Sequence, residues 1–239
     1  MALDGTRVLV VGGTSGLGLS VAAAAAERGA TPIVASRRQE SVDRALGTLP
    51  SGALGATVDL TDPDSIDRLI GYAAPIDHLV YTAGEPLRIT MMPDLTPDTV
   101  RRFWETRFVG ALSVIRAASM AGAIRASVVL TGGNASQRSA PGWALGASVC
   151  GAIEALVRQL ALELAPIRVN AVAPGITRSP LWSGMSPDQE EAMYADLASR
   201  LPVGRVGEPS DVALSYIYAM EQRMTTGTSI LVDGGAVLV

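Results

Sequence analysis

A glycine-rich turn near the N-terminus is the first stretch of the sequence whose residue types and spacing point to chemistry. It reads Gly12-Gly13-Thr14-Ser15-Gly16-Leu17-Gly18 and lies between a β-branched run at 7–11 and an alanine-rich segment at 18–28. Glycines at a strand-to-helix turn let backbone N–H groups at the helix start approach a pyrophosphate closely. We therefore expect Gly12, Thr14, Ser15, Gly16, Leu17 and Gly18 to bind a nucleotide cofactor.

The end of the second predicted strand indicates which cofactor. An NAD site places an acid about 20 residues beyond the glycines, whereas an NADP site needs donors and positive charge for the 2′-phosphate. Ser36 stands in the place of the acid, with Arg37 and Arg38 beside it. The two arginines alone would also suit the solvated start of a helix. Because no acid is present, the sequence favours NADP(H) over NAD(H).

Short β-branched runs alternate with longer helix-like segments along the chain, which is the pattern of a parallel sheet. The predicted strands are 7–11, 32–35, 56–59, 78–82, 127–131, 167–172 and 229–232, and the predicted helices include 18–28, 40–49, 64–73, 97–120 and 147–164. No linker, charge block or repeat interrupts the pattern. We predict one α/β domain over 1–239, with a lid-like segment at about 177–199.

Composition excludes several classes of function. The 239 residues are 48% hydrophobic and 18% charged, with a formal net charge of −4 and dispersed arginines, so a nucleic-acid partner is not expected. One cysteine and one histidine exclude an internal disulfide and the usual zinc ligand sets. The absence of an apolar run of about 18 residues and of a signal-peptide layout favours a soluble cytoplasmic protein without a metal or membrane partner.

Ordered motifs over nearly the whole chain resemble the short-chain dehydrogenase/reductase family. They are Gly12-x-x-x-Gly16-x-Gly18, Val58-Asp59-Leu60, Ala83-Gly84, the run Arg168 to Gly175, Gly204 to Pro209, and Val232 to Gly235. The resemblance implies a doubly wound, seven-stranded Rossmann-type sheet with helices on both faces, a nicotinamide cofactor and commonly a tetramer. A helix at 97–120 that is apolar on two faces, together with the apolar tail 236–239, also suggests a homo-oligomer, either a dimer or a tetramer.

The resemblance also implies cofactor contacts beyond the glycine turn. Asp59 matches the residue that contacts adenine, although an acid before a helix also suits a capping role. The remaining positions expected at the cofactor are Leu60, Ala83, Gly84, Pro174, Gly175, Thr177 and Ser179, of which the last four match the segment that holds the nicotinamide end.

The catalytic residues of the family are missing. Its reaction uses a tyrosine as proton donor, a lysine four residues later, a serine that polarises the carbonyl, and an asparagine on the long helix. Counting from neighbouring motifs, these positions fall on Gly146, Cys150, Gly133 and Arg107 respectively. A shift of alignment does not restore them, because all 19 basic residues are arginine and no tyrosine lies between Tyr81 and Tyr194.

Replacement groups are therefore needed if the protein is an enzyme. Arg107 is a candidate cation towards an enolate or carboxylate, which suggests a small ligand that can be anionic, and Asn134 is an uncharged donor near the missing serine. Tyr194 in the lid segment is the one tyrosine that we expect to be able to reach the site. Trp143 either fills the space left at Gly146 or leaves a pocket for a bulkier ligand.

Three functions remain open on the sequence. The first is an NADP(H)-dependent oxidoreductase acting on a small carbonyl, alcohol or enone through a non-standard site. The second is a catalytically inactive NADP(H)-binding protein that acts as a regulator or partner subunit. The third is a non-redox cyclase, lyase or isomerase that uses the widened pocket. The intact cofactor motifs favour the first.

Overall fold

Seven parallel strands form one sheet in the order β3-β2-β1-β4-β5-β6-β7. The computed structural model describes residues 3–239. The strands are β1 Arg7–Val11, β2 Thr31–Ser36, β3 Leu54–Thr57, β4 Ile76–Tyr81, β5 Ile124–Thr131, β6 Arg168–Pro174 and β7 Ser229–Val232. Strand order reverses between β1 and β4, which is where doubly wound sheets bind ligands. The predicted seven-stranded Rossmann-type fold is confirmed.

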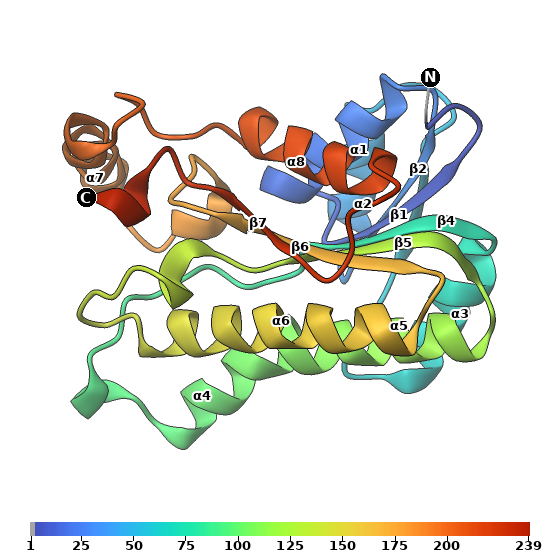
Figure 1. The fold of residues 1–239 in the computed structure, drawn as a ribbon, viewed down its shortest axis with the longest axis horizontal. Coiled ribbons are helices and arrows are strands. Elements are labelled where there is room, and N and C mark those ends of the chain that lie inside the picture. Colours follow the sequence, from blue (N-terminus) through green and yellow to red (C-terminus); the bar gives the residue numbers. More distant parts are fainter. Residues whose placement is uncertain (1–2) are drawn as a thin grey trace.

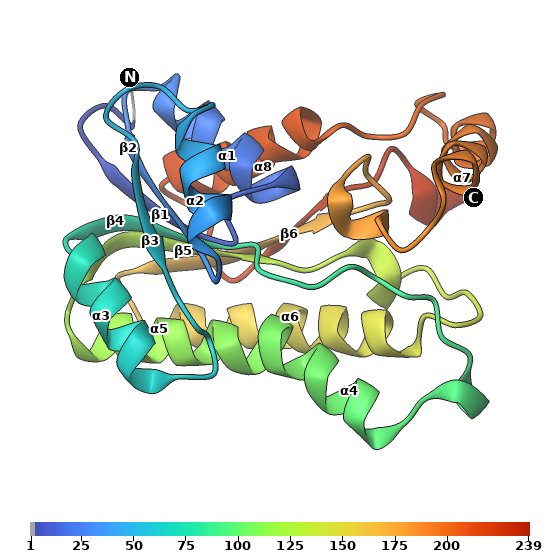
Figure 2. The ribbon, with the colours of Figure 1, turned by 180° about the vertical axis from the view of Figure 1, so that it is seen from behind.

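Helices cover both faces of the sheet (Figures 1 and 2). On one face lie α1 Gly16–Ala26, α2 Gln39–Leu46 and α8 Pro209–Glu221, and on the other lie α3 Pro63–Ala73, α4 Pro97–Trp104, α5 Gly110–Met120 and α6 Ala144–Glu163. Helix α7, Pro187–Arg200, lies apart from these layers, near the C-terminus. Short 3₁₀ turns occur at Met92–Asp94, Asn134–Ser136, Pro180–Trp182 and Ala236–Leu238.

The central strands are apolar along their whole length because both faces of the sheet are covered. In β1, Val8 and Val10 belong to the core beneath α1 and α8, whereas Leu9 and Val11 belong to the core beneath α3, α5 and α6. All four side chains are fully buried. Consecutive residues thus anchor opposite layers, and the strand ends are held in fixed positions at one edge of the sheet.

Proline marks the start of four helices, namely α3, α4, α7 and α8. Proline suits the first helical position because its missing N–H would have no partner there. The side chain before three of these prolines caps its helix: Asp62 accepts a hydrogen bond from the backbone N–H of Asp64, Thr96 accepts one from that of Thr99, and Ser186 accepts one from that of Gln189. These caps fix where α3, α4 and α7 begin.

The structure differs from the sequence prediction in several boundaries. The predicted helix 97–120 contains a π-helical turn at Glu105–Val109 that separates α4 from α5. Strand β3 ends at Thr57, so that Asp59 lies in the following loop rather than at the strand end. Helix α8 was not predicted. The helix predicted at 147–164 begins earlier, at Ala144, and has the length and apolar composition of a membrane span. In this fold α6 packs along β5 and β6 as a flanking helix.

Candidate active site

A cleft of about 620 Å³ opens at the carboxyl ends of β1, β4, β5 and β6. Every residue that the sequence assigned to the cofactor lines it: Gly12, Thr14, Ser15, Gly16, Leu17, Gly18, Ser36, Arg37, Arg38, Asp59, Leu60, Ala83, Gly84, Pro174, Gly175, Thr177 and Ser179. Asn134 lines the same cleft, as do the four positions that the sequence analysis matched to the family's catalytic residues, namely Arg107, Gly133, Gly146 and Cys150. Tyr194 is not among its lining residues.

The glycine turn is shaped by contacts that exclude a side chain. Gly12 has a left-handed φ of +85°, and a Cβ there would lie 2.7 Å from the Cα of Ala83. At Gly18, a Cβ would lie 2.9 Å from the carbonyl carbon of Gly12 and would also meet the hydroxyl of Thr82. The turn therefore presses against the end of β4 and directs the start of α1 into the cleft. This is a cradle of the kind that a pyrophosphate fits.

The two arginines after β2 lie at one end of the cleft. Arg37 and Arg38 are both exposed, and within residues 3–239 neither forms an ion pair with an acid. Asp59 accepts hydrogen bonds from the backbone N–H and hydroxyl of Thr61 through Oδ1, at 2.9 and 2.7 Å. The hydroxyl bond is the main cause of a lowered pKa of Asp59. One carboxylate oxygen of Asp59 remains available to a ligand.

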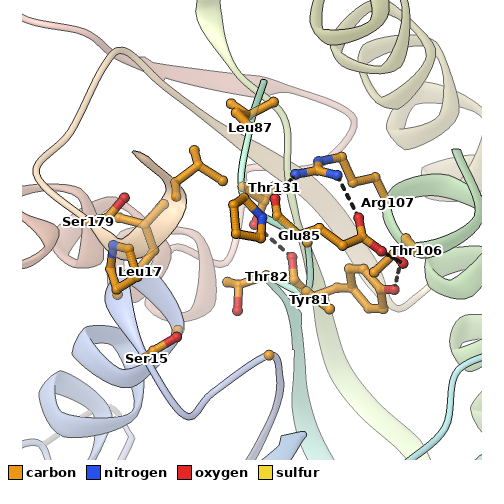
Figure 3. Close-up of a pocket in the computed structure, with 18 of the residues that line it drawn as sticks. Ser15, Leu17, Tyr81, Thr82, Glu85, Leu87, Thr106, Arg107, Thr131 and Ser179 are labelled. Atoms are coloured by element: carbon orange, nitrogen blue, oxygen red, sulfur yellow. Dashed lines mark hydrogen bonds and ion pairs between the residues drawn. The ribbon is translucent and has the colours of Figure 1, made fainter. Parts of the chain in front are cut away.

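Arg107 belongs to the π-helical turn, and its side chain extends from there into the end of the cleft opposite Arg37 and Arg38. Its side chain is 14% exposed, and the guanidinium donates from Nη1 to Oε2 of Glu85 at 2.9 Å, while Nη2 donates to the backbone oxygen of Glu85 (Figure 3). The ring centroid of Phe103 lies 4.1 Å from Cζ. A Cβ at Gly84 would lie 3.2 Å from the same atom, so a side chain there would press on the guanidinium. These contacts hold the guanidinium in one place.

Burial lowers the pKa of Arg107, and the Glu85 carboxylate opposes that shift. A guanidinium titrates so far above neutrality that the group stays charged. The other oxygen of Glu85 accepts a hydrogen bond from the Thr106 hydroxyl, and the backbone oxygen of Thr106 accepts one from Tyr81. Burial raises the pKa of Tyr81 well above its usual range, which makes it a poor proton donor. The cleft thus contains the fixed cation of Arg107 and the half-exposed acid Glu85.

Gly133 and Gly146, two of the positions that the sequence analysis matched to the family's catalytic residues, are closely covered by neighbouring side chains. A Cβ at Gly133 would lie 3.0 Å from Sγ of Cys150, and a Cβ at Gly146 would lie 3.2 Å from a ring carbon of Trp143. The Trp143 ring also packs edge-on to Trp182, with centroids 6.1 Å apart. Trp143 therefore occupies the space directly over Gly146 and also lines the cleft.

Cys150 has the surroundings of a packing residue rather than of a nucleophile. Burial raises the pKa of the Cys150 thiol to about 11, and the nearby Glu154 carboxylate adds to that shift. At neutral pH the thiol therefore remains protonated, and only a thiolate is strongly nucleophilic.

Asn134 lines the cleft, where its amide nitrogen donates to Oδ2 of Asp233 at 3.3 Å. The same carboxylate accepts hydrogen bonds from the backbone N–H groups of Gly235 and Val237. Asn134 thus links the loop after β5 to the turn after β7, and this contact uses one of its two N–H groups. The other is available to a ligand.

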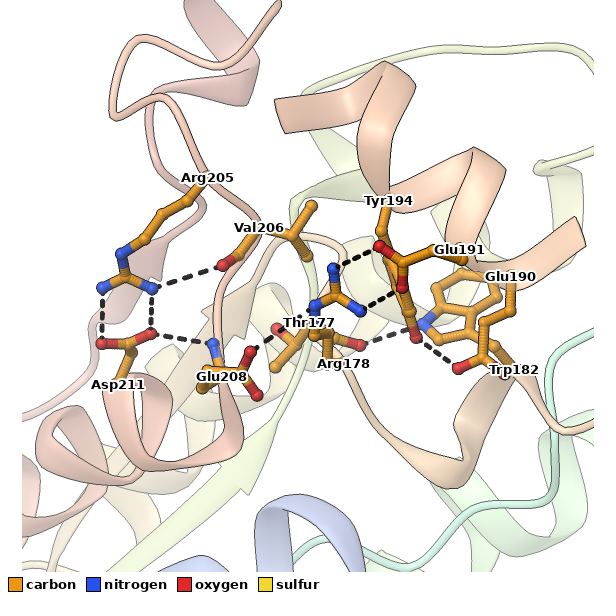
Figure 4. Close-up of polar contacts among 10 residues, drawn as sticks. All are labelled: Thr177, Arg178, Trp182, Glu190, Glu191, Tyr194, Arg205, Val206, Glu208 and Asp211. Carbon is orange, nitrogen blue, oxygen red and sulfur yellow. Dashed lines mark hydrogen bonds and ion pairs between the residues drawn. The ribbon is translucent and has the colours of Figure 1, made fainter. Parts of the chain in front are cut away.

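The lid segment is held by a separate network outside the cleft (Figure 4). Arg178 binds both carboxylate oxygens of Glu191, at 2.7 and 3.1 Å, and lies 3.5 Å from Glu208. The Tyr194 ring is 3% exposed beneath this guanidinium, and its hydroxyl donates to Glu190 at 2.6 Å. Tyr194 is therefore part of the lid core and does not reach the cleft in this structure.

Sequence reasoning missed several residues that line the substrate end of the cleft. Glu85 directly follows the Ala83-Gly84 motif, but nothing in the sequence links it to Arg107, 22 residues away. Trp182, Phe103, Leu87 and Leu181 are apolar lining residues of the cleft, and they lie on three separate segments. Within residues 3–239, no group of three His, Cys, Asp or Glu side chains is placed to hold a metal ion.

Comparison with known proteins identifies the family. Residues 11–237 match the family model described as enoyl-(acyl carrier protein) reductase. A short-chain dehydrogenase/reductase from Stachybotrys chlorohalonatus is 37% identical, over 99% of this chain and 98% of the relative. The chain belongs to the short-chain dehydrogenase/reductase family. The resemblance predicted from the glycine turn and the later motifs is thus confirmed.

Solved structures of short-chain dehydrogenases/reductases superimpose over the whole chain. The MalC reductase/Diels-Alderase from Malbranchea aurantiaca has a TM-score of 0.91 and 30% identity, with 100% of this chain and 98% of that chain covered. A small-chain dehydrogenase in complex with NADPH has a TM-score of 0.85 and 33% identity, with 99% and 100% covered. The cofactor side of the cleft thus has the architecture of a dinucleotide-binding family.

Proposed function

We propose that the protein is an NADPH-dependent reductase of an organic carbonyl or enone, in which Arg107 holds the substrate oxygen. The observation that carries the proposal is the position of Arg107. Its guanidinium lines the cleft together with the glycine turn and with Gly133, Gly146 and Cys150, where the family places its own catalytic groups. A charged group held at the substrate end of a cofactor cleft is a suitable partner for a developing oxyanion.

The preference for NADPH rests on the residues after β2. Ser36 provides a hydroxyl donor, and Arg37 and Arg38 provide positive charge, since neither forms an ion pair within residues 3–239. The similarity to a dehydrogenase crystallised with NADPH supports the same choice. When bound, NADPH supplies a hydride to the substrate carbon.

Arg107 would stabilise the negative charge that this transfer leaves on the oxygen. A guanidinium has five N–H donors, of which Glu85 accepts two, so three remain for a ligand. For a ketone the charge collects on the former carbonyl oxygen, and for an enone it collects on the oxygen of an enolate. Removing a single donor of this kind typically lowers kcat by about 10²- to 10³-fold.

The proton that completes the reduction is assigned to water. Tyr81 and Tyr194 have pKa values raised by burial, and their hydroxyls already donate to the backbone oxygen of Thr106 and to Glu190 respectively. The Cys150 thiol, with a pKa of about 11, is a weak acid. The cleft is open to solvent on the side of the exposed Glu85, so water can reach the oxygen of an alkoxide or the carbon of an enolate.

The test is NADPH oxidation across a panel of ketones and enones, with the variant Arg107→Met. We expect turnover by the wild type, a loss of at least about 100-fold in kcat for Arg107→Met, and unchanged NADPH affinity in that variant. Arg88→Met is the matched control, because Arg88 is exposed and does not line the cleft. Tight NADPH binding without turnover would instead support the inactive binding protein.

A ring-forming reaction without net redox is a second candidate. The observation in its favour is the similarity to MalC, a protein described as both a reductase and a Diels-Alderase, combined with glycines at two of the family's catalytic positions. A carbonyl hydrogen-bonded to Arg107 would be a better electron acceptor in such a ring closure. Product formation from an unsaturated substrate with NADP⁺ in place of NADPH, followed by mass spectrometry, separates this activity from reduction.

A further inference from the structure

Arg107 has its own counter-ion inside the cleft. Oε2 of Glu85 lies 2.9 Å from Nη1, the backbone oxygen of Glu85 accepts from Nη2, and Oε1 accepts from the hydroxyl of Thr106 (Figure 3). Within residues 3–239, Glu85 is the one acid that pairs with Arg107. The cation at the substrate end is therefore already neutralised by a carboxylate that the chain supplies.

The contacts around Arg107 and Glu85 hold both side chains in their paired orientation. Gly84 and Phe103 both lie against the guanidinium, and the Arg107 side chain is 14% exposed. Glu85 follows Gly84 directly in the chain, and its carboxylate is tied at both oxygens. The Glu85 side chain is nevertheless 50% exposed and lines the cleft, so that a bound ligand would meet its negative charge.

We propose that Glu85 sets the charge selectivity of the cleft, so that Arg107 receives a neutral carbonyl oxygen and a carboxylate is rejected. This proposal rests on the proposed function, in which Arg107 is the group that holds the substrate oxygen. A neutral carbonyl needs only the N–H groups that Glu85 leaves unused. A carboxylate would lie beside a second carboxylate or would have to displace it from its two hydrogen bonds, to Arg107 and to Thr106, and like charges at such distances repel strongly.

The test uses two probes that differ in charge and that NADPH does not reduce. Sodium benzoate and benzamide have nearly the same shape, and their binding to the NADPH-saturated protein is measured by isothermal titration calorimetry. The variant Glu85→Gln keeps the side-chain shape but removes the charge. We expect the wild type to prefer benzamide and the variant to bind benzoate more tightly by about tenfold or more, with benzamide changed less than twofold.

Glu191→Gln is the matched control. It removes the same charge from an acid that also pairs with an arginine through two hydrogen bonds, but Arg178 and Glu191 lie outside the cleft. We expect this control to leave the affinity of both probes unchanged. Glu85→Ala, which removes the carboxylate without introducing an amide, must give the same ranking as Glu85→Gln, and NADPH binding checks that each variant is folded.

The proposal is overturned if benzoate binds Glu85→Gln and Glu85→Ala no better than it binds the wild type. It is equally overturned if Glu191→Gln gives the same gain, because the effect would then be one of overall charge. Neither measurement needs turnover, so the result is independent of whether the panel of ketones and enones reveals a reductase.

Discussion

Replacing both arginines after β2 tests the cofactor assignment most directly. Arg37 and Arg38 line the cleft, are exposed and have no acidic partner within residues 3–239. Their charges are therefore available to the 2′-phosphate, the group by which NADPH differs from NADH. We expect the double variant Arg37→Ala/Arg38→Ala to lose NADPH affinity and to keep its affinity for NADH.

The size of the expected loss in NADPH affinity follows from the solvent exposure of Arg37 and Arg38. Two unit charges about 4 Å apart gain about 1 kcal/mol in water, and more where the protein excludes water. A phosphate monoester carries about 1.5 to 2 negative charges at neutral pH, so each exposed arginine should contribute about 1–2 kcal/mol. This corresponds to about 5- to 30-fold in the dissociation constant for each arginine, and the loss should shrink at high salt.

The assay is a fluorescence titration with NADPH and with NADH for wild type, both single variants and the double variant. Arg44→Ala is the control, because Arg44 is an exposed arginine in the last turn of α2 that does not line the cleft. Equal losses for NADPH and NADH, or the same loss in Arg44→Ala, would refute the assignment of these arginines to the 2′-phosphate.

Three further predictions concern stability and the cofactor cradle. Gly18→Ala should lower the melting temperature and abolish tight NADPH binding, because its Cβ would overlap the preceding backbone, at a cost of about 1–3 kcal/mol measurable by urea unfolding. Gly151→Ala should stabilise α6 by about 0.5–1 kcal/mol. Gly146→Ala should gain less stability and should shift the tryptophan emission, because its Cβ would lie 3.2 Å from Trp143. Equal gains in stability for the two variants would contradict the packing described. Burial lowers the pKa of His78 to about 4, so between pH 6.5 and pH 4 the imidazole is protonated in the unfolded chain and neutral in the folded chain. The contribution of His78 to the free energy of unfolding should be fully present above pH 6.5 and should fall by roughly 2–3 kcal/mol towards pH 4. In NMR, the chemical shift of the His78 imidazole should not titrate above about pH 5.

The cofactor half of the site was predictable because it is encoded locally. The glycine turn, Ser36 and the two following arginines each lie next to a strand end, and parallel strands bring their carboxyl ends to one edge. Their positions in the cleft therefore follow once the strands are recognised. The fold class follows from the same alternation of strands and helices.

The substrate half depends on contacts between distant segments and could not be predicted in this way. Counting from Gly110 placed Arg107 at the family's asparagine position, but its pairing with Glu85 depends on a π-helical turn that sequence periodicity does not indicate. Tyr194 was expected to be able to reach the site, yet it is buried because Trp182 and Leu197 pack with it into a separate lid core. Burial of this kind is decided by tertiary packing.

The contacts at Gly133 and Gly146 also constrain how this site can change by mutation. A serine introduced at Gly133 would press on Cys150, and a tyrosine at Gly146 would have to displace Trp143. Each of these substitutions therefore requires its neighbour, Cys150 or Trp143, to shift, and neighbouring substitutions of this kind are not additive. The effect of a change at Gly133 or Gly146 should thus depend on the residue that stands at position 150 or 143. The order in which such substitutions are made then affects whether each one is tolerated.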